Sequence, residues 1–242
     1  MRDNPNYEVI KEPRGFIKCL EIFLAIFAFS CVTGFRGQFS FHQHVNGTSH
    51  RVDGHFKYPF SGSISLNMAN DTMKNIIDVP LEIDERSSTE FFVVIGVFCF
   101  LYSLGVLVYY TWFEEDNKQP SSATFSPPVI DFVAGGFWAF FWFVSACAQA
   151  AAVRSIKSST DVNELIKSLA LCKITYTCSI DKAAKYATLT ISILLGFLNV
   201  FVWAGNMWFL WKETPWHRDA TSKPAVTQQK PQHQPTPPAT AI

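Results

Sequence analysis

The sequence lacks an excess of charge of either sign, because 20 Lys and Arg residues balance 20 Asp and Glu residues. Nucleic-acid-binding proteins usually carry a basic patch, so the overall charge gives no reason to expect nucleic acid as a partner. Charge is also scarce, at 17% of the 242 residues, whereas 48% of the residues are hydrophobic and 23 are Phe. Such a composition is too apolar for an ordinary soluble domain of this length and predicts a membrane protein.

Short motifs of catalysis and cofactor binding are absent as well. The chain contains no G-x-S-x-G, H-E-x-x-H, P-loop or dinucleotide-binding pattern. We therefore expect no enzyme, no catalytic residue and no cofactor. Four of the six histidines lie between residues 42 and 55, without a Cys or a compact set of carboxylates, so we predict a solvated loop and no metal site there. A response of these imidazoles to pH is the alternative use.

Four apolar stretches predict a bundle of membrane-crossing helices, each of which needs about 20 mostly apolar residues. They lie at about 16–35, 91–113, 132–153 and 186–211. The last three carry no charged residue, and we expect no intramembrane charge in them. The first stretch spans only if Lys18 snorkels to the lipid headgroups and pairs with Glu21 at i,i+3. The predicted fold class is an all-α membrane protein with four transmembrane helices in one domain, residues 16–214.

The first apolar stretch has a second interpretation as a cleaved signal peptide. Basic residues precede it, and Ala28-x-Ser30 resembles a cleavage site. Glu21 and the long leader argue against cleavage. We therefore keep residues 1–15 as a cytosolic N-terminus, and sequencing of the mature N-terminus would decide the question.

The sidedness of the chain follows from two covalent signals in the predicted loops 36–90 and 154–185. Both N-x-S/T glycosylation sequons, at Asn46 and Asn70, fall in the first loop. Cys172 and Cys178 are the only Cys pair outside the apolar helices, and they fall in the second loop, which fits an oxidising compartment. We expect both loops to be lumenal, and both termini and the 114–128 loop to be cytosolic.

The segment after Trp216 is rich in Thr, Gln, Lys and Pro and lacks the apolar residues that a core needs. Residues 215–242 are therefore predicted to form a disordered cytosolic tail. Its last residues, Thr240-Ala241-Ile242, match the S/T-x-apolar form that PDZ domains bind. A PDZ-domain partner is accordingly a weak hypothesis.

One face of the fourth apolar stretch carries Gly196, Asn199, Trp203 and Asn206 at helical spacing. Amides in hydrocarbon seek partners, so Asn199 and Asn206 are predicted to pack helices together through hydrogen bonds. The alternative is a conduction path, which would make the chain a channel or a junction-type tetraspan. We favour packing because transporters and pumps usually carry intramembrane charge.

Several segments resemble the synaptophysin family, whose four-helix membrane domain is of the MARVEL type. These segments are Lys11–Lys18, Tyr58–Phe60, Ser87–Val93, Phe100–Ser103, Trp142–Ser145, Gly196–Asn199, Trp203–Phe209 and Lys212–Thr214. The resemblance covers about residues 11–214. The chain departs from vertebrate relatives in three respects: its first loop has no Cys, it has Gln149 and Ala151 in the third helix, and its tail is short without Tyr-Gly repeats.

The resemblance implies a non-enzymatic protein of synaptic or other small transport vesicles that functions in exocytosis and membrane trafficking. Its implied partners are the lipid bilayer with cholesterol, a synaptobrevin-like fusion protein and further copies of itself in a homo-oligomer. Together with the compartment argument, it also implies a disulfide between Cys172 and Cys178, with two free thiols as the alternative.

Overall fold

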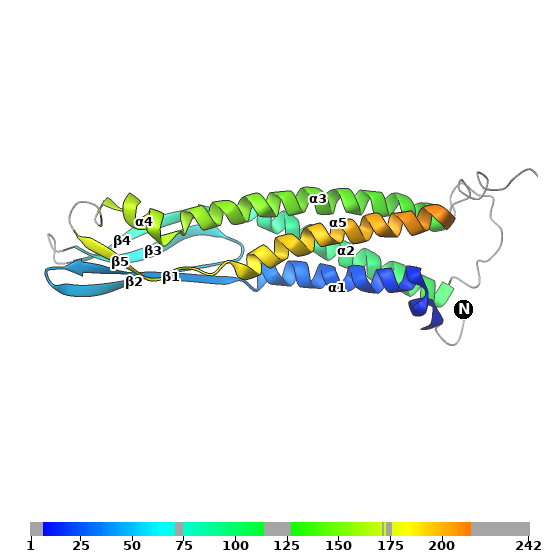
Figure 1. The fold of residues 1–242 in the computed structure, drawn as a ribbon, viewed down its shortest axis with the longest axis horizontal. Coiled ribbons are helices and arrows are strands. Elements are labelled where there is room, and N and C mark those ends of the chain that lie inside the picture. The colour runs from blue at the N-terminus through cyan, green and yellow to red at the C-terminus, as the bar shows by residue number, and fades with distance from the viewer. Residues whose placement is uncertain (1–6, 71–74, 114–126, 171, 173–175, 214–242) are drawn as a thin grey trace, which may run out of the picture.

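A computed structural model describes residues 7–70, 75–113, 127–170, 172 and 176–213 of the chain. The molecule is elongated, with long helices at one end and strands at the other (Figure 1). The elements in chain order are η1 (Tyr7–Lys11), α1 (Pro13–Thr33), β1 (Arg36–Val45), β2 (Thr48–Lys57), β3 (Ser61–Asn70), β4 (Asn75–Asp84), α2 (Arg86–Phe113), α3 (Pro127–Ser159), α4 (Val162–Ser168), β5 (Thr177–Lys182) and α5 (Ala187–Glu213). We call β1 to β5 together with α4 the sheet domain.

Four helices, α1, α2, α3 and α5, are long and apolar enough to cross a membrane, in agreement with the four predicted spans. Each turns large apolar side chains outward: Phe27, Phe98, Phe140 and Phe201, one from each helix, are 48–73% exposed. A surface of this kind is unfavourable in water and compatible with hydrocarbon. The predicted ranges 91–113 and 132–153 are the uncharged centres of α2 and α3, which begin earlier, and α3 also ends later.

The helices run alternately up and down, so that α1 begins and α5 ends at the same end of the molecule (Figure 1). Helix α5 packs against α1 and α3, α2 packs on α1, and the contact between α2 and α3 is looser. Gly196 of α5 permits close approach, because a Cβ there would lie 2.8 Å from the Phe92 ring and 3.1 Å from the Cβ of Ala146. Small residues thus bring three helices together, as expected in membrane bundles.

Helix α3 connects the bundle to the sheet domain. Its 33 residues make it about 50 Å long, whereas the hydrocarbon core of a bilayer is about 30 Å thick. Ile156 in its last turns is fully buried. Just beyond its end, the hydroxyl oxygen of Thr160 lies 2.6 Å from that of Tyr186, which precedes α5. The two helices are therefore tied together where they leave the bundle.

The expectation of an all-α protein is wrong for the segments between the helices, because they form two antiparallel sheets. One sheet has the order β2-β1-β5 and the other pairs β3 with β4. Along β1 the odd-numbered residues from 37 to 45 are buried, which is the period of two that a strand requires. Asn46 and Gly47 have φ values of 48° and 80°, as a two-residue hairpin turn demands.

The two sheets are joined by a buried side-chain amide. Nε2 of Gln43 on β1 donates a hydrogen bond to the carbonyl oxygen of Ala69 on β3 at 2.8 Å, and Oε1 accepts one from the Ala69 amide at 2.9 Å. The side chain of Gln43 therefore pairs with a backbone as a strand would. Nearby, a Cβ on Gly54 would lie 2.3 Å from the Phe39 ring, so glycine is what lets this ring pack flat on the hairpin.

Candidate functional site

Lys18, Glu21 and Asp131 lie inside the helix bundle, and each is only 1–3% exposed. Lys18 and Glu21 are one turn apart on α1, and Asp131 lies near the start of α3. Nζ of Lys18 is 3.2 Å from Oε2 of Glu21 and 3.1 Å from Oδ1 of Asp131. A single ammonium group therefore contacts two carboxylates that are far apart in the sequence.

Hydroxyl and amide donors from the other helices surround the two carboxylates. Glu21 accepts hydrogen bonds from Oγ of Ser103 at 2.8 Å and from Nδ2 of Asn206 at 3.1 Å. Asp131 accepts hydrogen bonds from the hydroxyl groups of Tyr102, at 2.8 Å, and Tyr110, at 3.0 Å. These donors come from α2 and α5. Each of the four carboxylate oxygens thus accepts one hydrogen bond from these donors, and Oδ1 of Asp131 also accepts one from Nζ of Lys18.

The ammonium group of Lys18 is also covered by aromatic rings. Its Nζ lies 5.0 Å from the centroid of the Trp203 ring and 5.4 Å from that of Tyr102. Cation–π contacts at such distances stabilise a desolvated cation by about 2 kcal/mol. The cost of removing the ammonium group of Lys18 from water is therefore offset by two carboxylates and two aromatic rings.

We call Lys18, Glu21, Tyr102, Ser103, Tyr110, Asp131 and Asn206 the charge cluster. Its members come from all four long helices. With every acid and the amine ionised, its formal charge is −1, from two carboxylates and one ammonium group. Buried ions are stable in a protein only when they are paired and hydrogen-bonded, and here both conditions are met. The hydrogen bonds and ion pairs of the cluster therefore join the four helices and hold them in one arrangement.

The charge cluster corrects two expectations from the sequence. Lys18 does not snorkel to the headgroups, because Asp131 and two aromatic rings give it partners inside the bundle. The expectation of no intramembrane charge is also wrong, because α3 begins at Pro127 and so contains Asp131, one residue before the predicted span. The pairing of Lys18 with Glu21 is confirmed. A carboxylate directly before an apolar run was the available signal for Asp131.

The two asparagines predicted to pack helices are both buried. Asn206 joins the charge cluster through Glu21, so it links α5 to α1. Asn199 donates its Nδ2 hydrogen bond at 2.9 Å to the carbonyl oxygen of Leu195, within its own helix. Of these two asparagines, only Asn206 therefore has an interhelical hydrogen bond to another described residue.

A groove separates α2 from α3 beside the charge cluster. It has a volume of about 320 Å³ and is lined mainly by apolar surface, with Gly105, Val106 and Ile130 among its walls. Asp131 and its two tyrosine partners also line it. Apart from its own stretch of helix, no described residue has a heavy atom within 4 Å of a Cβ built on Gly105, which leaves space there. The groove can accept an apolar molecule that carries one small polar group.

The predicted covalent sites lie at the other end of the molecule, in the sheet domain. Asn46 is exposed at the β1–β2 turn, and Asn70 ends β3. Cys172 and Cys178 form a disulfide with a Cα–Cα distance of 5.5 Å, and Cys178 belongs to β5, which pairs with β1. The two predicted lumenal loops therefore share one sheet. The tail with its Thr240–Ile242 motif lies outside the described residues.

The histidines of the first loop are spread over the sheet instead of facing one point. His44 and His55 lie at opposite ends of the β1–β2 hairpin, because His44 pairs with Ser49 near the turn and His55 pairs with Gln38 near the start of β1. Within the described part of the chain, no group of three or more His, Cys, Asp or Glu side chains is arranged to bind a metal ion.

A comparison with protein families places these features in context. Residues 9–209 match the model of the MARVEL family, described as a membrane-associating domain. The match begins just before α1 and ends within α5, so it includes α1, α2, α3 and most of α5, together with the charge cluster and the sheet domain.

Proposed function

This chain belongs to the MARVEL family of membrane-associating domains and is an integral membrane protein with four candidate spans, and from that premise we propose that it organises the membrane of small transport vesicles, as a member of the synaptophysin type. Proteins with this domain are typically non-enzymatic. The charge cluster supports a scaffold role, because its polar groups are used to join the four helices and the outer surface stays apolar. In this role the chain binds its partner proteins through its apolar outer surface and catalyses no reaction on them.

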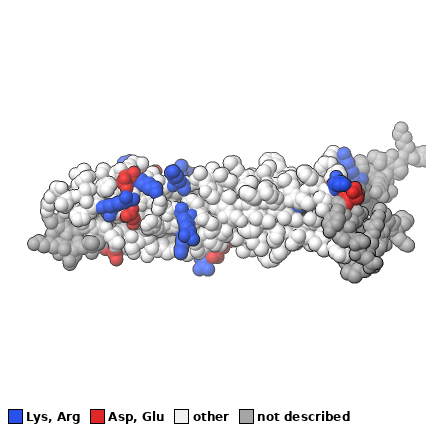
Figure 2. Space-filling model, turned by 90° about the horizontal axis from the view of Figure 1, so that it is seen from below, with Lys and Arg blue, Asp and Glu red and all other residues white. Residues whose placement is uncertain are grey.

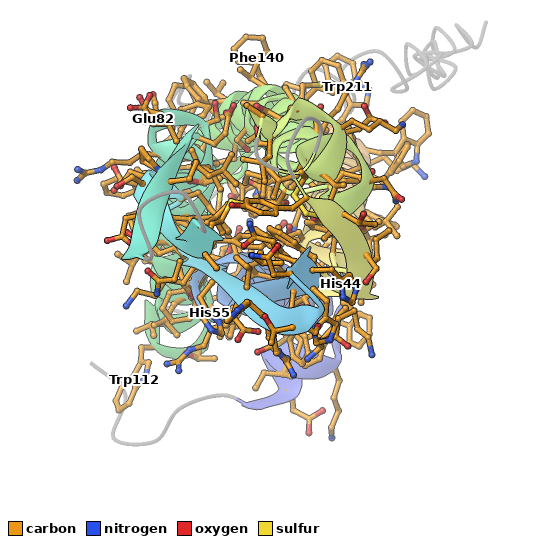
Figure 3. All side chains as sticks on the ribbon, turned by 90° about the vertical axis from the view of Figure 1, so that its left-hand side faces the viewer. His44, His55, Glu82, Trp112, Phe140 and Trp211 are labelled. Carbon is orange, nitrogen blue, oxygen red and sulfur yellow. A yellow bond between two sulfur atoms is a disulfide. The ribbon has the colours of Figure 1, made fainter. Side chains whose placement is uncertain are left out.

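The main partner in this proposal is a synaptobrevin-like fusion protein, whose single membrane helix packs against the outer face of α3. This face carries Val133, Phe137 and Phe140 at helical spacing, and they are 54–62% exposed. Figure 3 shows Phe140 projecting away from the ribbon. An aromatic stripe of this kind offers a partner helix ring contacts worth about 1 kcal/mol each.

Co-purification from vesicles, with identification of the bound proteins, tests this role. Phe137→Ala combined with Phe140→Ala should reduce the recovered fusion protein about fivefold or more, because two ring contacts are lost. Phe201→Ala is the control, since Phe201 is a ring on α5 that is even more exposed than Phe137 and Phe140. Equal recovery with both variants would remove α3 as the binding face, and absence of any fusion protein from the wild-type sample would remove the proposed role.

We assign cholesterol, the implied lipid partner, to the groove between α2 and α3. A sterol has one hydroxyl on a rigid apolar body, which matches apolar walls beside Asp131 and its tyrosines. Gly105→Phe fills the groove, whereas Gly205→Phe adds the same ring at a position of α5 that also has open space. Labelling by a photoreactive cholesterol should fall only in the first variant. Unchanged labelling would place the sterol elsewhere.

The orientation in this proposal puts both termini in the cytosol and the sheet domain in the vesicle lumen. Both sequons and the Cys172–Cys178 disulfide support it, because they belong to the same end of the molecule. Homo-oligomers and a PDZ-domain contact at Ile242 also belong to the proposal. Deletion of Ile242 with an unchanged set of bound proteins would dispose of the PDZ contact.

Channel activity is the alternative function, with the Asn199 and Asn206 face as its lining. Conductance of the purified, reconstituted chain distinguishes the two functions. A current that Asn206→Leu abolishes would support the channel, whereas the scaffold proposal expects no current and a less stable bundle, because Asn206 donates to Glu21.

A further inference from the structure

A second cavity lies in the sheet domain, at its membrane-proximal end. Its volume is about 590 Å³. It lies between the first residues of β1 and β3 and the last residues of β2 and β4. Arg36, His55 and Lys57 line it on the β1–β2 hairpin, and Phe60 and Ile83 belong to its apolar wall. We call this cavity the basic pocket.

The cations of the basic pocket have no counter-ions in the described part of the chain. Arg36 and Lys57 are directly opposite each other in the register of β1 and β2. Neither makes an ion pair there, and no Asp or Glu lines the pocket. By contrast, Arg51 on the same hairpin pairs with Asp53, at 3.0 Å, and with Asp181. Two adjacent unpaired cations at a concave surface attract an anion.

The position of the pocket selects the source of that anion. Arg36 lies three residues after the end of α1, and Ile83 of the pocket lies three residues before the start of α2. Figure 2 shows Lys and Arg side chains gathered where the uncharged surface of the helices meets the sheet domain. This junction is the level of the lipid headgroups in a bilayer crossed by α1 and α2.

We propose that the basic pocket binds the phosphate group of a lipid in the leaflet that adjoins the sheet domain. Arg36 and Lys57 contact the phosphate oxygens, and the apolar wall with Phe60 and Ile83 packs against the glycerol and the first carbons of the acyl chains. A free inorganic anion would use the cations but leave this wall against water. The lipid uses both, so a lipid headgroup is the occupant that matches the chemistry of the pocket.

Native mass spectrometry of the full chain in detergent tests the proposal with dioleoylphosphatidylglycerol as the probe. Arg36→Gln combined with Lys57→Gln should weaken its binding about 25-fold, at about fivefold for each cation near a membrane surface. Lys182→Gln combined with Lys185→Gln is the control, because both residues are exposed near the same junction and neither lines the pocket. The control should change binding less than about twofold.

Four further measurements make the result decisive. The charge-preserving pair Arg36→Lys and Lys57→Arg should retain binding, and the single change Lys57→Gln, at an exposed position, should weaken it about fivefold without touching the core. Dioleoylglycerol, which lacks the phosphate, should bind poorly. Equal weakening by the two double variants would show general attraction of anionic lipid and overturn the proposal. Full displacement of the lipid by millimolar inorganic phosphate would also overturn it and assign the pocket to a soluble anion.

Discussion

Removal of the single cation from the charge cluster should destabilise the bundle more than removal of one of its acids. Lys18→Met leaves Glu21 and Asp131 buried with a formal charge of −2 and no ammonium group between them. Asp131→Asn leaves one cation facing one carboxylate, although a tyrosine hydroxyl loses an acceptor. The order of the two effects therefore depends on charge balance and not on the number of hydrogen bonds.

The expected magnitudes differ enough to measure. Breaking a buried ion pair by removing one partner costs about 3–5 kcal/mol. Loss of one buried hydrogen bond costs about 1–3 kcal/mol. At about 2–4 °C per kcal/mol for a chain of this size, Lys18→Met should lower Tm by roughly 6–20 °C, and Asp131→Asn by clearly less. Lys18→Met combined with Glu21→Gln restores the formal charge of the wild type and should recover part of the loss.

Thermal unfolding in mild detergent, followed by tryptophan fluorescence, provides the assay. Lys167→Met is the control, because Lys167 forms an ion pair with Glu164 on the exposed face of α4, and it should leave Tm unchanged. The reasoning about charge balance fails if Asp131→Asn lowers Tm as much as Lys18→Met does. It also fails if the double variant is no more stable than Lys18→Met alone.

Four other predictions concern the sheet domain. Gly54→Ala should destabilise the chain by about 1–3 kcal/mol, because the added Cβ would overlap the Phe39 ring, whereas Gly205→Ala has open space and should be neutral in the same unfolding assay. Endoglycosidase should lower the apparent mass of the wild type but not of Asn46→Gln if Asn46 carries the main glycan; loss of the shift only on mutation of the other sequon would contradict this. In protein from vesicles, Cys172 should be alkylated only after reduction, and labelling without reductant would show that the disulfide is absent. A hydrogen bond from Ser40, supported by nearby Arg51 and His42, holds the pKa of Asp181 below its ordinary value of 3.8. The stabilisation that ionised Asp181 gives to the contact of β5 with β1 is therefore fully present above pH 3.8 and is lost only as pH falls through the lower pKa of the folded state. Hydrogen exchange of β5, corrected for intrinsic rates, should accordingly give the same protection at pH 7 and pH 5.5. Loss of protection at pH 5.5 would contradict the lowered pKa of Asp181.

The sequence by itself determined the features that depend on local composition and period. The four spans could be read from uncharged apolar runs, since lipid requires about 20 such residues whatever the rest of the chain does. The contact of Lys18 with Glu21 could be read from their i,i+3 spacing. The alternation in β1 and the Asn46-Gly47 turn also carry a local signal for the first hairpin.

Only the tertiary structure decided where the charges of the bundle go. Asp131 is 113 residues from Lys18, and no local pattern says that α3 turns this carboxylate toward α1. The same holds for the pairing of β1 with β5, which brings the disulfide loop to the first hairpin, and for the basic pocket built from four strand ends. Period and composition fix which face of an element is apolar. Which elements meet, and at what register, is set by how their side chains pack together in three dimensions.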